Sequence, residues 1–253
     1  MSWLPVSYTL PVAHRGYSTR APENTLAAYR EALDAGATHV ECDVHLSGDG
    51  TPYVIHDSSV ERTTDGHGEV KTLSDHVLDR LDAGAWKDRR YADERVPRLE
   101  ALLTLLKGRT SLALEIKAPK MERAVVEALN TTGFPRSDLS LFAFDFDTLV
   151  RSLSIDPALH CTYLIDLDGL EAPDADTAWA SAVQRSQDAG MSAIGPGDAG
   201  VSPSRVQQAQ EAGLSVFVWT VDDARRMREL SGWGADAIMS NDVPLALKTL
   251  KGT

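Results

Sequence analysis

A chain of 253 residues, 43% hydrophobic and 25% charged, has the composition of a globular protein and the length of one α/β barrel. Its net charge of −12 argues against binding to nucleic acid or to an anionic membrane surface, since no cluster of Lys and Arg opposes it. No apolar run reaches the roughly 18 residues of a membrane span, and the first residues do not resemble a signal peptide. We therefore expect a cytoplasmic protein without stable membrane insertion.

Short β-rich runs alternate with amphipathic helical runs along most of the chain. The helical stretches 23–37 and 204–214 each carry a Gly near their end, where it can close a helix in the left-handed conformation, and a strand follows. Strands separated by helices are joined in parallel. The predicted strands cover residues 10–16, 39–46, 51–57, 111–117, 139–145, 160–166, 191–197, 214–221 and 235–241.

These strands predict an α/β fold, a (β/α)8 TIM barrel in a single domain over residues 1–253. Nine strands are one more than the barrel needs. Residues 51–57 follow the preceding strand after only "SGDG", which is too short for a parallel crossover, so we expect a hairpin above the barrel. The polar, turn-rich segment of about residues 58–98 then interrupts the alternation. We interpret it as a small insertion that caps the barrel mouth after the second barrel strand.

Two carboxylates stand inside the strand 39–46, in "VECDV". Because side chains alternate along a strand, Glu41 and Asp43 share one face and apolar residues take the other. In "LALEIK", Glu115 and Lys117 likewise share a face. The helix-facing side of a barrel is apolar, so these charges should point inward near the strand C-termini, where barrel enzymes build their sites.

Three converging carboxylates would repel one another unless protons or a cation neutralised them. Oxygen ligands without cysteine suit Mg²⁺ or Ca²⁺. Arg15 and Lys117 add positive charge, and a phosphate would fit such a setting. Taken singly, Glu41 or Glu115 could simply meet solvent or pair with a basic residue. Their combination with strand-end histidines favours a functional site.

Cys42 and Cys161 lie in predicted strands without the spacing of a zinc site, and we expect both to be buried free thiols.

The segments "AHRG", "PENTLAAY", "VECDVHLSGDGTPYVIHD", "ERTTDGHG", "VPRLEALL", "LALEIK", "VFVWTV" and "GADAIMSNDVP" resemble, in type and order, those of glycerophosphodiester phosphodiesterases. The resemblance covers nearly the whole chain. It implies a (β/α)8 barrel with an insertion after the second strand. It also implies hydrolysis of glycerophosphodiesters, such as glycerophosphocholine or glycerophosphoethanolamine, to sn-glycerol 3-phosphate and an alcohol.

The resemblance further implies that His14 and His56 act in acid/base catalysis and that Glu41, Asp43 and Glu115 bind the metal. It implies that Arg15 and Lys117 bind the phosphate. Glu23, Asn24 and Trp219 would line the site. Asn24 also suits a helix N-cap, and Trp219 equally suits the barrel core. The metal would be Mg²⁺ or Ca²⁺.

The chain departs from the family pattern at three positions. Arg98 stands where Thr is common and Ala143 where Ser is frequent, which leaves the leaving-group preference open. Asp222 stands where Asn is usual. Outside the motifs, His45 could face the interior beside Asp43, where we interpret it as a polar neighbour rather than a ligand.

Two histidines on opposite sides of a phosphate suit acid/base cleavage near neutral pH. The nucleophile would be either the neighbouring glycerol 2-hydroxyl, giving a cyclic phosphate, or water. A lysophospholipase D-type activity is an alternative, although segment 58–98 has few aromatic and many charged residues, which favours a small soluble substrate. The barrel fold by itself would also suit a non-catalytic binding protein or a different barrel enzyme, such as a sugar-phosphate isomerase or aldolase.

Overall fold

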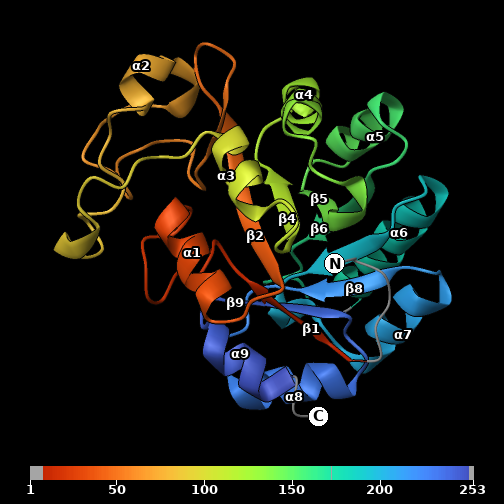
Figure 1. Ribbon diagram of the computed structural model, residues 1–253. Helices are drawn as coiled ribbons and strands as arrows, with labels where there is room; N and C mark the ends of the chain where they lie inside the picture. Colours follow the sequence, from red (N-terminus) through yellow and green to blue (C-terminus); the bar gives the residue numbers. More distant parts are fainter. Residues whose placement is uncertain (1–7, 172, 251–253) are drawn as a thin grey trace.

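The computed structural model describes residues 8–171 and 173–250, and the expectation about a signal peptide falls partly on residues 1–7, outside that range. Within the described residues, nine strands form one sheet in the order β1-β9-β8-β7-β6-β5-β4-β2-β3, and pairing of β1 with β2 closes it (Figure 1). The strands are β1 Leu10–Ala13, β2 His39–Leu46, β3 Pro52–Val54, β4 Ser111–Ile116, β5 Leu139–Ala143, β6 His160–Ile165, β7 Ala193–Pro196, β8 Ser215–Val218 and β9 Ala237–Ser240.

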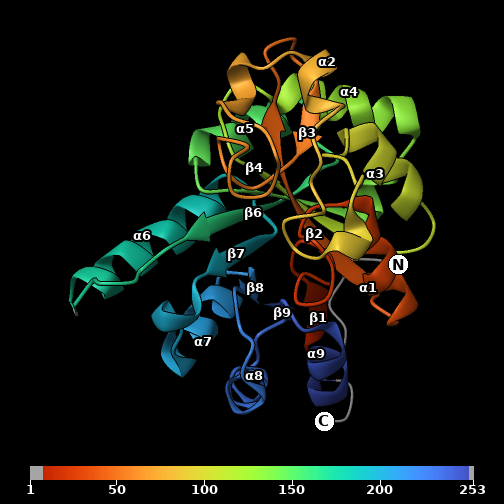
Figure 2. The same cartoon turned by 90° about the vertical axis from the view of Figure 1, so that its left-hand side faces the viewer.

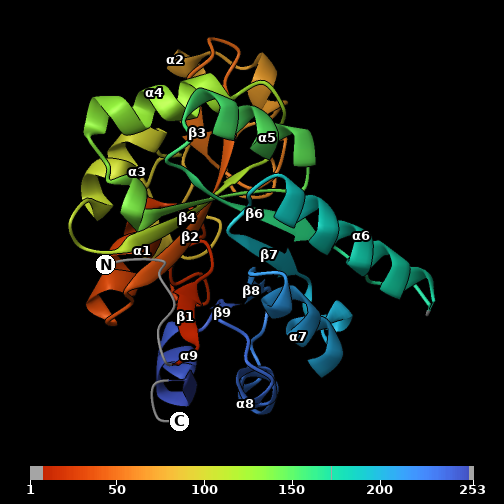
Figure 3. The same ribbon diagram turned by 90° about the vertical axis from the view of Figure 1, so that its right-hand side faces the viewer.

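Eight of these strands are parallel and make the predicted (β/α)8 barrel, and helices follow them on the outside (Figures 2 and 3). Each of the nine predicted strand segments contains a strand. The glycines expected to close helices, Gly36 and Gly213, both have positive φ. The helices are α1 Leu26–Asp34, α2 Asp75–Leu78, α3 Leu99–Leu106, α4 Glu122–Thr132, α5 Phe146–Ile155, α6 Asp174–Asp188, α7 Pro203–Glu211, α8 Ala224–Gly232 and α9 Val243–Leu250.

The ninth strand, β3, is the predicted hairpin. It pairs antiparallel to the end of β2, with Val54 opposite Val44, and it makes no ladder with the other barrel strands. Beyond β3, the backbone N–H of Ile55 donates to the carbonyl oxygen of Asp43 at 2.9 Å. The chain therefore runs back along β2 and carries residue 56 over the barrel mouth.

Residues 58–98 form the predicted insertion, which includes α2 and stands beside the mouth (Figure 2). A small apolar cluster of its own, with Val60, Val70 and Leu78 fully buried, packs on Tyr53 of β3. Its far end reaches the loop between β1 and α1, where the Lys87 ammonium donates to a backbone carbonyl at 2.9 Å. The insertion therefore covers the side of the mouth formed by the β1–α1 loop.

Apolar side chains fill both sides of the barrel wall. Outside, one large cluster joins the strands to the helices and includes Val40, Cys42 and Val44 of β2. Inside, a smaller cluster fills the barrel, with the rings of Phe142 and Phe217 stacked at 5.9 Å. The charged face of β2 therefore points inward, as the alternation predicts, and lies above an apolar floor. None of the helices in the described ranges combines the length and apolar character needed to cross a membrane.

Both cysteines are free and buried, as expected. Burial raises the pKa of the Cys161 thiol to about 12, and burial together with Glu41 raises that of Cys42 well above its usual value. Because the thiolate is the reactive form, we expect both to resist Ellman's reagent at pH 8 in the native protein and to react after unfolding in guanidinium. Rapid stoichiometric labelling of the native chain would contradict this packing.

Candidate active site

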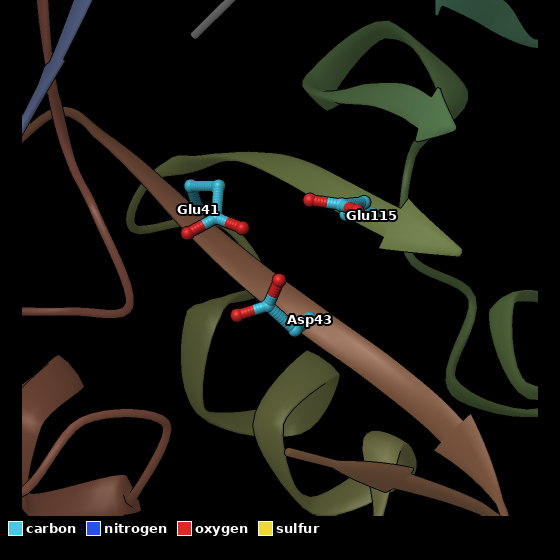
Figure 4. Close-up of side chains that lie close together, drawn as sticks. All are labelled: Glu41, Asp43 and Glu115. Carbon is cyan, nitrogen blue, oxygen red and sulfur yellow. The ribbon is translucent and has the colours of Figure 1, made fainter. Parts of the chain in front are cut away.

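Three carboxylates meet at the barrel mouth (Figure 4). Glu41 and Asp43 lie on β2, and Glu115 lies on β4 directly opposite Asp43 in the parallel ladder. An oxygen from each of the three lies within 4.8 Å of the others. Glu41 and Asp43 are 2% and 1% exposed, so this concentration of negative charge is shielded from water.

Asp43 is the carboxylate with the most counter-charge. Arg15 Nε lies 3.2 Å from its Oδ2, Lys117 Nζ lies 3.5 Å from its Oδ1, and Asn24 Nδ2 donates to Oδ2 at 2.8 Å. Burial opposes ionisation of Asp43, but the charges of Arg15 and Lys117 outweigh it and hold the pKa of this carboxyl below its usual value. Its Oδ1 is buried and accepts no hydrogen bond.

The other two carboxyls are pushed toward their neutral forms. Burial and the Asp43 charge raise the pKa of Glu41 well above its usual value, and they raise that of Glu115 to about 7 even though Lys117 Nζ lies 2.7 Å from it. A divalent cation would remove this conflict, and Asp43 Oδ1, which accepts no hydrogen bond, offers it a ligand. The three residues therefore suit a metal ion bound by oxygen.

The "HRG" segment wraps around the cluster at the end of β1. Arg15 has φ of +57°, which directs its backbone N–H to Glu41 Oε2 at 2.9 Å. Its side chain turns to Asp43 and to Glu23 Oε1, at 2.8 Å. Gly16 then passes against α1, where a Cβ would lie 2.7 Å from the backbone of Ala28. A side chain at position 16 would therefore displace the turn that places Arg15.

His14 is held by a chain of two hydrogen-bonded side chains. Asn241 Nδ2 donates to the Asp222 carboxylate at 2.6 Å, so the amide oxygen faces His14 Nδ1 at 2.8 Å. An amide oxygen only accepts, so Nδ1 carries the proton and Nε2 is free as an acceptor. Nε2 points toward the carboxylate cluster, 3.9 Å from Glu41 Oε2. Burial and the charge of Arg15 lower the pKa of His14 to about 4.

His56 follows β3 and has a partner of different chemistry. Its Nδ1 donates to Asp57 Oδ1 at 2.7 Å. Hydrogen bonds from Arg62 lower the pKa of Asp57 far below its usual value, so this partner is a carboxylate. His45 lies beside Asp43 on β2, as expected, and its Nε2 contacts the His56 carbonyl oxygen at 3.0 Å. It therefore supports the backbone of His56.

Several of these side chains line one pocket with a cavity volume of about 190 Å³. Its polar wall consists of His14, Arg15, Glu41, His56, Glu115 and Lys117, and its apolar wall includes Phe142, Phe144, Leu164, Trp219 and Met239. Trp219 donates its Nε1–H to the carbonyl of Gly195 at 2.8 Å and meets Phe144 edge to face at 5.4 Å. The pocket therefore has a charged half over β1, β2 and β4 and an aromatic half over β5 and β8.

Glu23 and Asn24 lie outside this pocket lining and act on it through other residues. Glu23 binds Arg15, and Asn24 is buried and binds Asp43. The prediction that Asn24 caps α1 is wrong. Thr25 is the N-cap, with its hydroxyl accepting from the N–H of Ala28, while the Asn24 amide oxygen accepts from the hydroxyl of Tyr29. Asn24 adopts a left-handed conformation, with φ of +59°, and its side chain binds the carboxylate cluster in place of capping the helix.

Four residues that hold the histidines and Arg15 in place had no predicted role. Asp57 and Arg62 follow β3, and Asp222 and Asn241 follow β8 and β9. Asp57, Asp222 and Asn241 are polar residues shortly after strand C-termini, which is the signal that could have found them, whereas Arg62 lies inside the insertion, where no such signal marks it. The family departures Arg98 and Ala143 lie elsewhere. Arg98 binds Asp79 in the insertion, and Ala143 is buried on the outer side of β5.

A family model described as the glycerophosphoryl diester phosphodiesterase family matches residues 14–245. The chain belongs to this family. A glycerophosphodiester phosphodiesterase of Caldanaerobacter subterraneus subsp. tengcongensis is 32% identical over 240 residues, which cover 92% of this chain and 94% of the relative. The family expected from the motifs is therefore confirmed, and with it an enzyme of the phosphoric diester hydrolase class.

Solved structures of family members have the same fold. A glycerophosphodiester phosphodiesterase from Agrobacterium tumefaciens has a TM-score of 0.80 at 33% identity, covering 95% of this chain and 99% of that one. A phosphodiesterase from Oleispira antarctica, solved in complex with the product sn-glycerol-3-phosphate, has a TM-score of 0.85 at 28% identity, covering 97% and 98%. These likenesses extend over nearly the whole chain.

The different charge states of Glu41 and Asp43 predict different costs of neutralising them. In EDTA, Glu41→Gln should change the free energy of unfolding by less than about 1 kcal/mol, because the native carboxyl is already disfavoured as an anion. Asp43→Asn should cost about 3 kcal/mol, because it leaves Arg15 and Lys117 without their shared counter-charge. Urea-induced unfolding measures both. Equal costs for the two variants would contradict this assignment of charge.

Proposed function

We propose that this enzyme hydrolyses glycerophosphodiesters, such as glycerophosphocholine or glycerophosphoethanolamine, to sn-glycerol 3-phosphate and the free alcohol. One observation carries the proposal: two histidines, two of the clustered carboxylates and two cationic side chains all line a single pocket at the strand C-termini. The Oleispira relative, solved with sn-glycerol-3-phosphate bound, supports the nature of the product.

Arg15 and Lys117 are the proposed phosphate ligands. Both are partly exposed to the pocket, and each is already fixed by a carboxylate of the cluster. Glu41, Asp43 and Glu115 are the proposed ligands of the metal, with Mg²⁺ or Ca²⁺ expected for an all-oxygen set. When bound, the cation would supply positive charge for the phosphate oxygens as negative charge builds up on them.

The two histidines receive different proposed roles because their Nδ1 partners differ. His14 faces a neutral amide and presents a proton-free Nε2, which suits a general base that accepts the proton of the attacking hydroxyl group. His56 faces the Asp57 carboxylate, which stabilises an imidazolium, and this suits a general acid that protonates the leaving oxygen. Either nucleophile, the glycerol 2-hydroxyl or water, would pass its proton to His14.

The size and lining of the pocket also bear on the competing functions. A cavity of about 190 Å³ favours a small diester over a lysolipid with a long acyl chain. The presence of the acid/base, carboxylate and cationic groups together argues against a non-catalytic binding barrel. The aromatic half of the pocket, with Phe144 and Trp219, is the proposed surface for the apolar atoms of the substrate.

Removing either histidine tests the acid/base assignment. We expect His14→Ala and His56→Ala each to lower kcat by about 10² to 10⁴-fold, as is typical for loss of a general acid or base, with little change in Tm. The measurement is release of glycerol 3-phosphate from glycerophosphocholine and glycerophosphoethanolamine. His67→Ala, an exposed histidine of the insertion, is the matched control. A His56→Ala enzyme with near wild-type kcat would overturn the assignment.

Metal removal tests the role of the carboxylates. Activity should disappear in EDTA and return with Mg²⁺ or Ca²⁺. The same additions should raise the Tm of the wild-type protein but not that of Asp43→Asn, because a ligand stabilises only a native state that binds it. Full activity in excess EDTA, or an equal rise in Tm for the variant, would contradict metal binding at this cluster.

A further inference from the structure

The guanidinium of Arg62, in the insertion, bridges two carboxylates that belong to different parts of the site. It donates to Asp57 from Nε at 2.6 Å and from Nη2 at 2.9 Å. It donates to Glu23 from Nη1 at 2.9 Å and from Nη2 at 2.8 Å. Both edges of the planar fork are therefore used, which a lysine ammonium cannot reproduce.

Each of these carboxylates also holds a residue of the pocket. Asp57 Oδ1 accepts from His56 Nδ1 at 2.7 Å, and Glu23 Oε1 accepts from Arg15 Nη1 at 2.8 Å. Arg62 thus contacts the proposed general acid, His56, through Asp57 and the proposed phosphate ligand, Arg15, through Glu23. The two ends of this chain come from separate segments, the loop after β1 and the end of β3.

The contacts of Arg62 are not required to attach the insertion to the barrel. Lys87 donates to the carbonyl of Ser18, and Arg90 and Tyr91 donate to the carbonyl of Arg20. These hydrogen bonds anchor the insertion to the β1–α1 loop by backbone contacts that involve no pocket residue. The bridge made by Arg62 is the contact that reaches the site.

We propose that Arg62 is a positioning residue that couples His56 to Arg15 through Asp57 and Glu23. The proposal rests on the proposed function. By fixing both carboxylates at once, the guanidinium sets the distance between the acid that protonates the leaving oxygen and the arginine that holds the phosphate. Without it, Asp57 and Glu23 each lose two hydrogen bonds, and the positions of His56 and Arg15 are no longer linked through one side chain.

The test compares Arg62→Gln and Arg62→Lys with wild type and with Arg98→Gln. Arg98 is the matched control, since it lies in the same insertion, is similarly exposed (43% against 45% for Arg62) and makes a two-fold contact with Asp79. We expect Arg62→Gln to lower kcat about 10²-fold, the usual scale of a misplaced catalytic group, with KM changed less than about threefold because Lys117 still binds phosphate. Arg62→Lys should recover no more than about a tenth of the wild-type kcat, and Arg98→Gln should stay within about twofold.

A second readout does not depend on activity. In wild type and in Arg98→Gln, the Nδ1–H proton of His56 should give a slowly exchanging signal in NMR spectra of protein labelled with ¹⁵N at histidine. In both Arg62 variants, exchange of that proton should accelerate, because Asp57 is no longer held in place. The positioning role would be overturned if exchange of this proton were unchanged in the Arg62 variants and kcat fell only in proportion to the fraction of unfolded protein. It would also be overturned if exchange were unchanged and Arg62→Lys restored the wild-type kcat. If wild type released no glycerol 3-phosphate, the proposed function would fail, and the exchange comparison would still decide the role of Arg62.

Discussion

The buried charge of Asp43 is the interaction on which the rest of the site depends. Arg15 and Lys117 approach it from two neighbouring strands, and together they keep it ionised where burial alone would not. Burial and that charge together make ionisation of Glu41 and Glu115 unfavourable. A cation bound in place of the protons would remove this conflict, and together with Arg15 and Lys117 it would make a region of positive charge in a chain whose net charge is −12.

The hydrogen-bond partners of His14 determine whether its neutral or its charged form is favoured. A carboxylate placed directly on His14 would favour its imidazolium, whereas the amide of Asn241 fixes the ring orientation without adding charge. The carboxylate of Asp222 stands one residue further away and fixes which way that amide points. An Asn at position 222 could pair with the amide in either orientation, so the carboxylate of Asp222 is what fixes the tautomer of His14.

Much of the fold follows from local patterns. The nine strands, the hairpin and the inward face of Glu41 and Asp43 were predictable because alternation and short turns are properties of neighbouring residues. The partner of His14 was not, since Asn241 lies 227 residues away and only the pairing of β1 with β9 brings it near. The alternative of Asn24 as an N-cap failed because tertiary contacts use both ends of its amide. Its Nδ2 donates to Asp43 and its Oδ1 accepts from Tyr29, which the sequence does not reveal.

The hairpin explains how a barrel surrounds its substrate from two sides. Side chains on the parallel barrel strands reach the mouth from below, whereas His56, the proposed general acid, comes from a segment that returns over the rim. β3 does this by pairing backwards along β2. The backbone N–H of Ile55 donates to the carbonyl of Asp43, and this hydrogen bond fixes how the returning segment aligns with β2. Asp43 is also the residue that carries the central charge. One backbone hydrogen bond therefore places His56 relative to the carboxylate cluster, while Arg62 of the insertion reaches the His56 side chain through Asp57.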